Sequence, residues 1–364
     1  MKKSLLATTA LAALGAVAVA GPATAAEKIK VSVGGYMEQW FGYADSSNNV
    51  QPDTDGFDQQ SDGEIIFTGS TTLDNGIKIG INVQLEAQTS GDTIDEQFAY
   101  VEGSFGRINL GSENAASYLM HYGIPSMGAG IDSGDAGNWV AGTEFTMART
   151  NGRGLDNDAE KLTYFTPRFS GFQLGASYVP SINQDNDAAP NQNDAIRDDS
   201  FSVALNFNRA FGDVKVQASA GYQDFGDDDG IAGDLESYQF GLRLGFGGFG
   251  IAGTYGEEDR ANNSFGLADR GRLGLANDQG FAGTQETIGA GVNYAAGPFG
   301  VSLNYIGSEI EDLNKEQDVF ELGAKYNLGP GVEARGSIYY SEAEEANADL
   351  AKGFAVVGGL KLGF

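Results

Sequence analysis

Residues 76–88, GIKIGINVQLEAQ, alternate strictly between apolar side chains and polar or glycine residues. One set consists of Ile77, Ile79, Ile81, Val83, Leu85 and Ala87, and the other of Lys78, Gly80, Asn82, Gln84, Glu86 and Gln88. Successive side chains of a β-strand point to opposite faces. The stretch therefore predicts a strand with one apolar face and one polar face.

The same period of two recurs along the chain, and no segment keeps a long helical period. Further apolar faces are Phe201, Val203, Leu205 and Phe207; Tyr238, Phe240, Leu242, Leu244 and Phe246; Phe299, Val301, Leu303 and Tyr305; and Phe354, Val356, Leu360, Leu362 and Phe364. The sequence therefore predicts an all-β protein.

Alternation fits either a soluble sandwich or a barrel with lipid outside and water inside. A soluble sandwich would carry charge on its outer, polar faces, whereas here those faces are mostly Gly, Ser, Asn, Gln and Thr, and the acids concentrate between the segments. Tyrosines near segment ends, such as Tyr178 and Tyr305, suit membrane interfaces. The pattern favours a transmembrane antiparallel β-barrel.

The connections between the segments give the size of the barrel. Short, turn-like connections lie at 74–76, 104–107, 167–171, 210–213, 247–248, 296–298 and 329–331. Longer polar ones lie near 44–61, 89–93, 112–158, 181–198, 225–234, 258–283, 310–315 and 344–351. Together they predict about sixteen strands, which is wide enough for an aqueous channel.

The N-terminus predicts export. Lys2 and Lys3 precede an uncharged apolar run that ends near Ala20, and Ala23-Thr24-Ala25 supplies small residues for cleavage. We therefore expect residues 1–25 to be a signal peptide and residues 26–364 to form the barrel. A membrane anchor is the alternative, but the run is too short for one.

Composition narrows the classes of partner. The chain has no cysteine, so a large regular framework rather than disulfides must stabilise it. Without Lys2 and Lys3, the 22 basic residues become 20 against 50 acidic ones, and the formal net charge goes from −28 to −30. This acidic excess argues against nucleic acid as a partner.

Several segments resemble the general-diffusion porins of Gram-negative bacteria, particularly those of alphaproteobacteria. The segments are KIKVSVGGY at 28–36, FAYVEG at 98–103, FGRINLG at 105–111, LTYFTP at 162–167, FSGF at 169–172 and the terminal KLGF at 361–364. The resemblance implies a sixteen-stranded homotrimer in the outer membrane that passes small hydrophilic solutes. It also implies that the barrel assembly machinery recognises Phe364, and that the third long loop, here 112–158, folds into the barrel and narrows it.

The chemistry of such a channel is the width and the electric field of its constriction. The loop offers Glu113, Asp132, Asp135, Glu144, Asp156 and Asp158, and inward parity on the strands gives Lys30, Lys78, Arg107, Lys215, Arg243, Lys325 and Arg335. We expect Asp132, Asp135 and Glu144 to face Lys30, Lys78, Arg107 and Arg243 across the pore. For the acids the alternative is a solvated loop charge, and for the bases a lumen ion pair such as Lys325 with Glu333. The acidic excess predicts a weak preference for cations.

Three further features have simpler explanations. Gly245 to Gly250 matches the dinucleotide pattern G-x-G-x-x-G, but strand periodicity continues on both sides, which favours a hairpin. The acidic run 227–229 is best explained as a solvated loop, with loose divalent cation binding and bridging to lipopolysaccharide as the alternative. His121 is the only histidine, and no cysteine accompanies it, so no metal site, cofactor or catalytic triad is expected.

Two alternative functions remain open from the sequence. A solute-specific channel for sugars or other nutrients would need aromatic residues along the lumen, and Tyr36, Trp40, Tyr100 and Tyr339 have inward parity but are scattered along the chain. A structural or adhesive barrel would display recognisable loop modules, and none is evident. No enzymatic activity is predicted.

Overall fold

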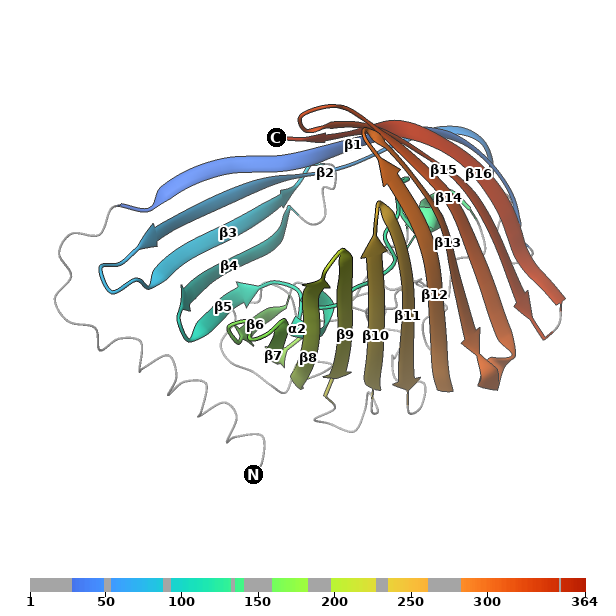
Figure 1. The fold of residues 1–364 in the computed structure, drawn as a ribbon. Helices are drawn as coiled ribbons and strands as arrows, with labels where there is room; N and C mark the ends of the chain where they lie inside the picture. Colours follow the sequence, from blue (N-terminus) through green and yellow to red (C-terminus); the bar gives the residue numbers. More distant parts are fainter. Residues whose placement is uncertain are drawn as a thin grey trace.

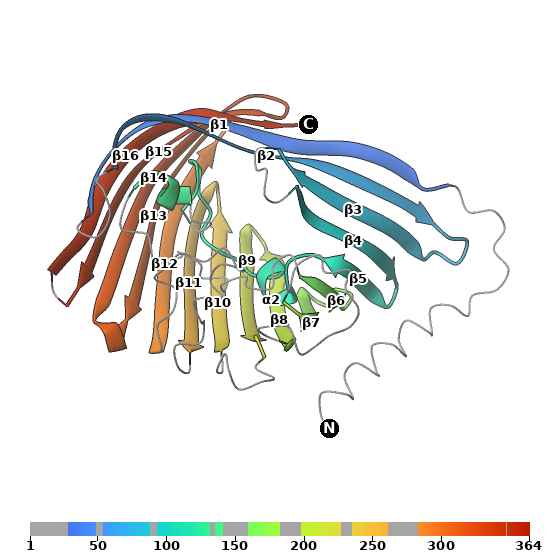
Figure 2. The ribbon, with the colours of Figure 1, turned by 180° about the vertical axis from the view of Figure 1, so that it is seen from behind.

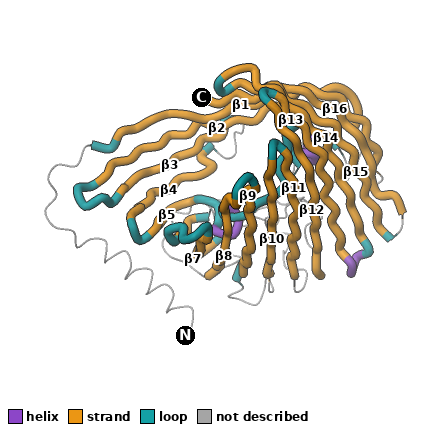
Figure 3. The backbone as a smooth tube through the Cα atoms, viewed as in Figure 1, coloured by secondary structure: helices purple, strands orange, loops and turns teal. Residues whose placement is uncertain are grey.

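A computed structural model describes residues 28–48, 54–87, 93–131, 135–140, 159–182, 198–226, 235–260, 283–346 and 348–364. The described chain is almost entirely strand, with three short helical turns (Figure 3). The strands are β1 (Lys30–Asn48), β2 (Thr54–Thr72), β3 (Lys78–Glu86), β4 (Ile94–Gly103), β5 (Gly106–Ser112), β6 (Glu160–Phe165), β7 (Phe172–Ser181), β8 (Asp198–Phe211), β9 (Val214–Asp224), β10 (Leu235–Phe246), β11 (Phe249–Arg260), β12 (Gly283–Ala296), β13 (Phe299–Ile310), β14 (Lys315–Gly329), β15 (Val332–Glu345) and β16 (Ala348–Gly363).

Each strand pairs antiparallel with its neighbours in sequence, and β1 also pairs with β16, so the sheet is a closed barrel (Figure 1). The predicted fold class and strand count are confirmed. Closure extends to the last residue, because Gly35 N–H donates to the Phe364 carbonyl at 3.0 Å and Phe364 N–H donates to Gly35 at 3.1 Å. No helix in the described ranges is long and apolar enough to cross a membrane.

The two faces of the wall differ as the alternation predicts. Outward side chains such as Phe240, Leu242 and Leu244 on β10 are exposed, as are Val301 and Leu303 on β13. Aromatic contacts run between neighbouring strands near both rims, for example Tyr222 with Tyr238, whose ring centroids lie 5.1 Å apart. An exposed apolar band edged by aromatic rings is the lipid-facing surface of a membrane barrel.

The predicted connections match the structure at the short turns. Phe246 pairs with Phe249, and Gly247 and Gly248 have φ of 56° and 88°, so the G-x-G-x-x-G stretch is a hairpin turn that only glycine adopts easily. The predicted long connection 44–61 is wrong in extent. β1 continues to Asn48 and β2 begins at Thr54, because the polar residues here alternate across a strand pair that extends the wall.

Candidate functional site: the inner wall and the loop segment 113–131

The inward face of the wall is built from small polar side chains. Ser177, Ser219, Ser302 and Ser337 are buried on four different strands, β7, β9, β13 and β15. They share one face because each has the inward parity of its strand. This face is therefore a row of hydroxyl groups that runs around the inside of the barrel.

The segment that follows β5 lies on this face. It comprises residues 113–131 and contains the short helix α2 (Ala116–Leu119). Figure 1 shows it passing behind β8–β12, and in the opposite view of Figure 2 it crosses in front of them, on the concave side of the wall. The part of the long 112–158 connection that the structure describes here is thus seated on the inside of the barrel.

Backbone N–H groups of the segment are satisfied by the wall hydroxyls. Ala116 N–H donates to Ser177 Oγ at 2.8 Å, and Tyr122 N–H donates to Ser219 Oγ at 3.0 Å. Farther along, Met127 N–H donates to Ser302 Oγ at 2.9 Å and Ala129 N–H to Ser337 Oγ at 2.8 Å. Buried backbone donors need partners, so the wall serines fix the path of this irregular segment.

Glycines on the wall allow the segment to approach closely. We call this set the glycine track, and it consists of Gly175, Gly241, Gly289, Gly291, Gly300 and Gly323. A Cβ at Gly300 would lie 2.8 Å from Met127 Sδ, and one at Gly323 would lie 2.6 Å from the Gly128 nitrogen. The glycines on the polar face therefore provide the room that the loop segment occupies.

Glu321 is the main side-chain anchor of the segment. It is fully buried on β14 and accepts four hydrogen bonds. Its Oε1 accepts from Ser126 Oγ at 2.8 Å, Gly130 N–H at 3.2 Å and Ser337 Oγ at 2.7 Å, and its Oε2 accepts from Asn304 Nδ2 at 2.9 Å. A buried carboxylate is tolerated when its oxygens are satisfied in this way.

An apolar cluster covers the far end of the described loop. Trp139 and Val140 follow the 3₁₀ turn η1 (Asp135–Asn138) and are buried together with Ile131, Trp40 and Tyr339. A Cβ at Gly42 would lie 2.7 Å from Trp139 Cζ3, so the indole lies directly on the backbone of β1. Trp40 and Tyr339, which are far apart in sequence, thus belong to one buried cluster that packs against the loop.

Two arginines hold the loop backbone from the wall. Arg243 Nε on β10 donates to the Gly123 carbonyl, and Arg335 Nη1 on β15 donates to the Gly128 carbonyl at 3.4 Å. Arg335 also pairs with Glu333, whose Oε1 accepts from Lys325 Nζ at 2.9 Å. The suggested lumen ion pair of Lys325 with Glu333 is present, and Arg243 touches the loop instead of facing it across open space.

Three further predicted basic residues, Lys30, Lys78 and Arg107, lie on β1, β3 and β5. Lys78 and Arg107 share the ring of Tyr100, with Lys78 Nζ 5.6 Å and Arg107 Cζ 4.2 Å from its centroid. Lys30 is exposed at the start of β1. Each of these residues has inward parity, and Lys78 and Arg107 form one cationic group around one aromatic ring.

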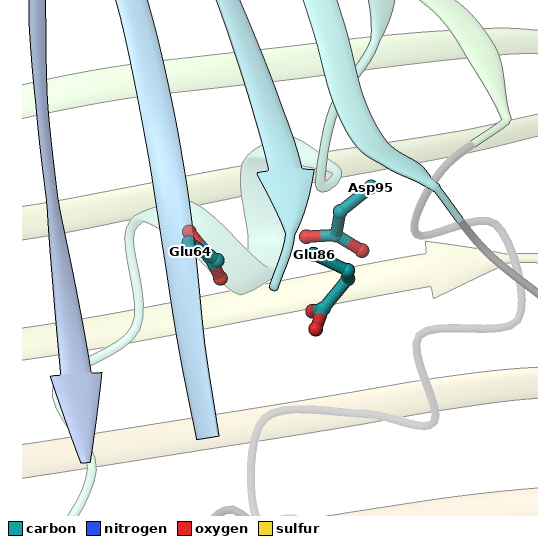
Figure 4. Close-up of side chains that lie close together, drawn as sticks. All are labelled: Glu64, Glu86 and Asp95. Atoms are coloured by element: carbon teal, nitrogen blue, oxygen red, sulfur yellow. The ribbon is translucent and has the colours of Figure 1, made fainter. Parts of the chain in front are cut away.

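A cluster of carboxylates lies at the opposite end of these strands from Lys78 and Arg107, toward the long connections. Glu64 on β2, Glu86 at the end of β3 and Asp95 on β4 have oxygens within 4.8 Å of one another (Figure 4). Tyr36 Oη donates to Glu64 at 3.2 Å and to Asp62 at 3.3 Å. The inner wall of β1–β5 thus carries both signs of charge, with Lys78 and Arg107 toward the short turns and this acidic cluster toward the long connections.

The predicted loop acids are only partly described. Glu113 is buried against Asn109, which donates to it, and burial raises the pKa of its carboxyl while Asn109, Arg107 and Lys161 oppose the rise. Asp132 and Glu144 lie outside the described residues, as do Asp156 and Asp158, and the side chain of Asp135 is not described. The segment 114–131 carries no Asp, Glu, Lys or Arg, so this part of the loop adds no acidic or basic side chain to the pore.

The chain matches the model of the Gram-negative porin family over residues 7–346. The chain belongs to this family. A porin of Rhodobacter capsulatus is 24% identical over 332 residues, which are 86% of this chain and 97% of that protein. The anion-selective porin of Comamonas acidovorans has the same fold, with a TM-score of 0.64, 17% identity, and coverage of 93% of this chain and 100% of that one. The trimer form of OmpT from Vibrio cholerae has a TM-score of 0.58 and 14% identity, and the match covers 93% of this chain and 100% of that chain.

Porins are non-enzymatic channels of the outer membrane, so this porin is a passive diffusion channel of that membrane. Sequence reasoning found its polar inner face but not the loop seat. The wall positions that contact the loop are serines and glycines of inward parity. Their role in binding the loop is seen only in the structure, where the segment lies on them. Nothing in the sequence distinguished Trp139 or Glu321 as an anchor.

Replacing Arg243 by glutamine is expected to increase the preference of this porin for cations. The guanidinium is a positive charge on the inner wall where it contacts the loop segment, and its removal should lower the barrier to cations. We expect a change of about twofold in the cation-to-anion permeability ratio, measured as a reversal potential in a salt gradient. Lys215→Gln removes the same charge from the wall at β9, away from the loop, and should change the ratio less. An equal shift in both variants would contradict a role for the loop region.

The burial of His121 predicts that the stability of the porin depends on pH. Burial, with the charge of Arg243, lowers the pKa of His121 to about 4, from an ordinary value of about 6.5. As the pH falls from about 6.5 to about 4, the unfolded chain binds a proton that the folded chain does not, so the folded state loses stability. The loss is at most about 1.4 kcal/mol per pH unit in this window.

His121→Gln should remove that contribution. The variant should gain stability relative to the unmodified porin as the pH falls through this window, and the difference should be constant above about pH 7. Urea unfolding in detergent at several pH values measures it. A stability difference that does not change with pH would show that His121 is accessible to protons in the folded barrel.

Proposed function

We propose that this porin is a general-diffusion channel that passes small hydrophilic solutes and ions, with a weak preference for cations, and that it is a homotrimer. The observation that carries the proposal is the closed sixteen-stranded barrel with a polar inner face on which a loop segment is seated. A sixteen-stranded barrel is wide enough for water, and an inward loop would set the upper size of the solute.

Narrowing of the channel by the whole 112–158 loop is part of this proposal. The seat of residues 113–131 supports it, because it directs the chain along the inner wall from β7 to β15. We propose that Asp132, Asp135 and Glu144 add acidic groups at the opening and that Lys30, Lys78 and Arg107 face them. Arg243 then contributes its charge from within the loop seat.

The cation preference rests on the acidic excess, a formal net charge of −30 when Lys2 and Lys3 of the proposed signal peptide are left out (20 basic against 50 acidic residues), since an acidic protein concentrates counter-ions near its channel mouth. The preference is weak because the described wall also carries inward bases, among them Lys78, Arg107, Arg243 and Arg335. The porin of Comamonas acidovorans has the same fold and is anion-selective, so the sign of the preference must come from side chains and not from the fold.

The other partners follow from the location. We propose that residues 1–25 direct export, that the exposed Phe364 is recognised during barrel assembly, and that the barrel needs no resident cofactor. Acidic groups at the loop end, including Glu342, Glu344 and Asp349 with oxygens within 4.8 Å of one another, suit loose divalent cations that bridge to lipopolysaccharide. The run 227–229, outside the described residues, is proposed for the same role.

Single-channel recording tests the proposal. The refolded full-length porin in a planar bilayer should give large ohmic steps that close in thirds, with a reversal potential that favours cations in a salt gradient. A small conductance that one sugar blocks would replace general diffusion by a solute-specific channel. Insertion without conductance would leave the structural or adhesive barrel, and an anion-favouring potential would overturn the selectivity.

A further inference from the structure

We propose that the short-turn end of the lumen holds a subsite for zwitterions of the α-amino-acid class, in which Arg107 receives the carboxylate and Glu102 receives the ammonium group. The inference rests on the proposed channel function and names a solute class for it. Short turns face the periplasm in barrels of this type, so the subsite lies on the exit side of the loop segment.

The subsite is a hollow of about 710 Å³ between the wall and the loop. Glu102 and Arg107 line it from β4 and β5, Phe165 from β6, and Leu119 and Met120 from the loop segment. This volume falls in the range that suits small-molecule sites, and its lining combines a few charges with apolar side chains.

Arg107 is held ready for a carboxylate. Its Nε donates to Asn109 Oδ1 at 2.7 Å, and its Cζ lies 4.2 Å from the Tyr100 ring centroid. Among the described residues, neither Nη group donates a hydrogen bond. A guanidinium that is fixed on a ring and has two free donors binds carboxylates in a bidentate manner.

Glu102 supplies the opposite charge beside it. It lies directly across the ladder from Arg107, and from Lys78 on the other side. Its carboxylate is exposed and, within the described ranges, makes no hydrogen bond and no ion pair within 4.0 Å. Facing residues of a ladder have Cβ atoms about 5 Å apart, so two unpaired opposite charges remain close together.

Tyr100 explains why these neighbours do not pair. Its ring draws both Lys78 and Arg107 toward itself, and therefore away from the carboxylate of Glu102. The other arginine of the hollow, Arg168, is already used, because it donates to the Gly171 carbonyl and to Gln173 Oε1, each at 2.7 Å. The second carboxylate of the hollow, Glu113, is buried and already accepts from Asn109. Arg107 and Glu102 are thus left for a solute.

The apolar lining indicates what lies between the two charges. Leu119 is 41% exposed, and Met120 and Phe165 lie beside it in the lining. An aliphatic side chain can cover these groups while its ammonium and carboxylate meet Glu102 and Arg107. Leucine is therefore a suitable probe.

The experiment compares three solutes on the full-length porin in planar bilayers. Leucine, 3-methylbutylamine and 4-methylpentanoate carry the same isobutyl group, but the amine lacks the carboxylate and the acid lacks the ammonium group. Leucine should reduce the ion current saturably, with a half-effective concentration at least tenfold lower than that of either analogue. Equal effects of the three solutes, or no effect of leucine on an open channel, would overturn the subsite while leaving the channel function intact.

Variants assign the two charges. R107Q and E102Q should each raise the half-effective concentration of leucine about tenfold, and R107K should raise it less. K215Q removes the same charge as R107Q outside the hollow and should leave leucine block unchanged. Conductance of each variant shows that its barrel has formed, and leucine block that survives both R107Q and E102Q would overturn the assignment. A complete absence of conductance in the unmodified protein would instead contradict the proposed function.

Discussion

Glu321→Ala is expected to lower the free energy of unfolding by about 4 kcal/mol and to increase the single-channel conductance. The buried carboxylate accepts from Ser126, Gly130, Asn304 and Ser337, and its loss leaves several buried donors without an acceptor. Each such donor costs about 1–3 kcal/mol, although hydroxyl groups that turn to other partners reduce the sum. The loop segment 126–130 then loses its main side-chain anchor and moves away from the wall.

Urea unfolding in detergent micelles and planar-bilayer recording measure the two effects. Glu316→Ala removes a carboxylate from the outward, exposed side of the same strand and should change stability by less than about 0.5 kcal/mol. Glu321→Gln keeps the shape of the side chain, so its effects on stability and conductance should lie between those of Glu321→Ala and Glu316→Ala. If Glu321→Ala leaves both quantities as they are, the carboxylate does not hold the loop.

Trp139→Ala is expected to destabilise the barrel by about 3–5 kcal/mol and to make the channel current noisier. The indole is buried with Trp40, Ile131, Val140 and Tyr339, so its removal leaves a cavity between the loop and the wall. Because the cluster joins the loop to the strands near β1, the loop gains freedom to move across the lumen.

A double-mutant cycle with Gly42→Ala tests the contact itself. A Cβ at position 42 would lie 2.7 Å from Trp139 Cζ3, so Gly42→Ala should destabilise the unmodified porin. In the Trp139→Ala background, Gly42→Ala should lower the free energy of unfolding by at least about 1 kcal/mol less than in the unmodified porin, because the indole ring is absent. A residual cost is expected, since the Cβ also approaches the Val356 carbonyl at 3.0 Å. Strict additivity would show that the indole does not lie on Gly42.

The strands were predictable because their pattern is local. In residues 76–88 each inward position is polar or glycine, and the structure keeps that assignment in β3. The error at 44–61 has the same origin. Asp45 and Asp55 looked like loop residues, but they pair across β1 and β2 because these two strands extend beyond the apolar band.

The loop seat was not predictable, because it depends on contacts between residues far apart in sequence. Ser337 meets Ala129 and Glu321 meets Ser126, and nothing near either wall residue indicates a partner. Arg243 had the correct parity, but only the structure shows it donating to the Gly123 carbonyl. Periodicity assigns a side chain to a face, whereas the loop that covers the face is fixed by packing and by hydrogen bonds.

Closure of the barrel through β1 and β16 makes the two ends of the chain structurally dependent on each other. Tyr36 pairs with Gly363, and Gly35 exchanges hydrogen bonds with Phe364. A chain that stops before β16 would leave β15 and β1 with unpaired edges inside lipid, where backbone groups have no water to bind. The barrel can therefore close only after β16 has been synthesised. An interrupted or shortened chain lacks this strand, so it should not form a partial pore that leaks.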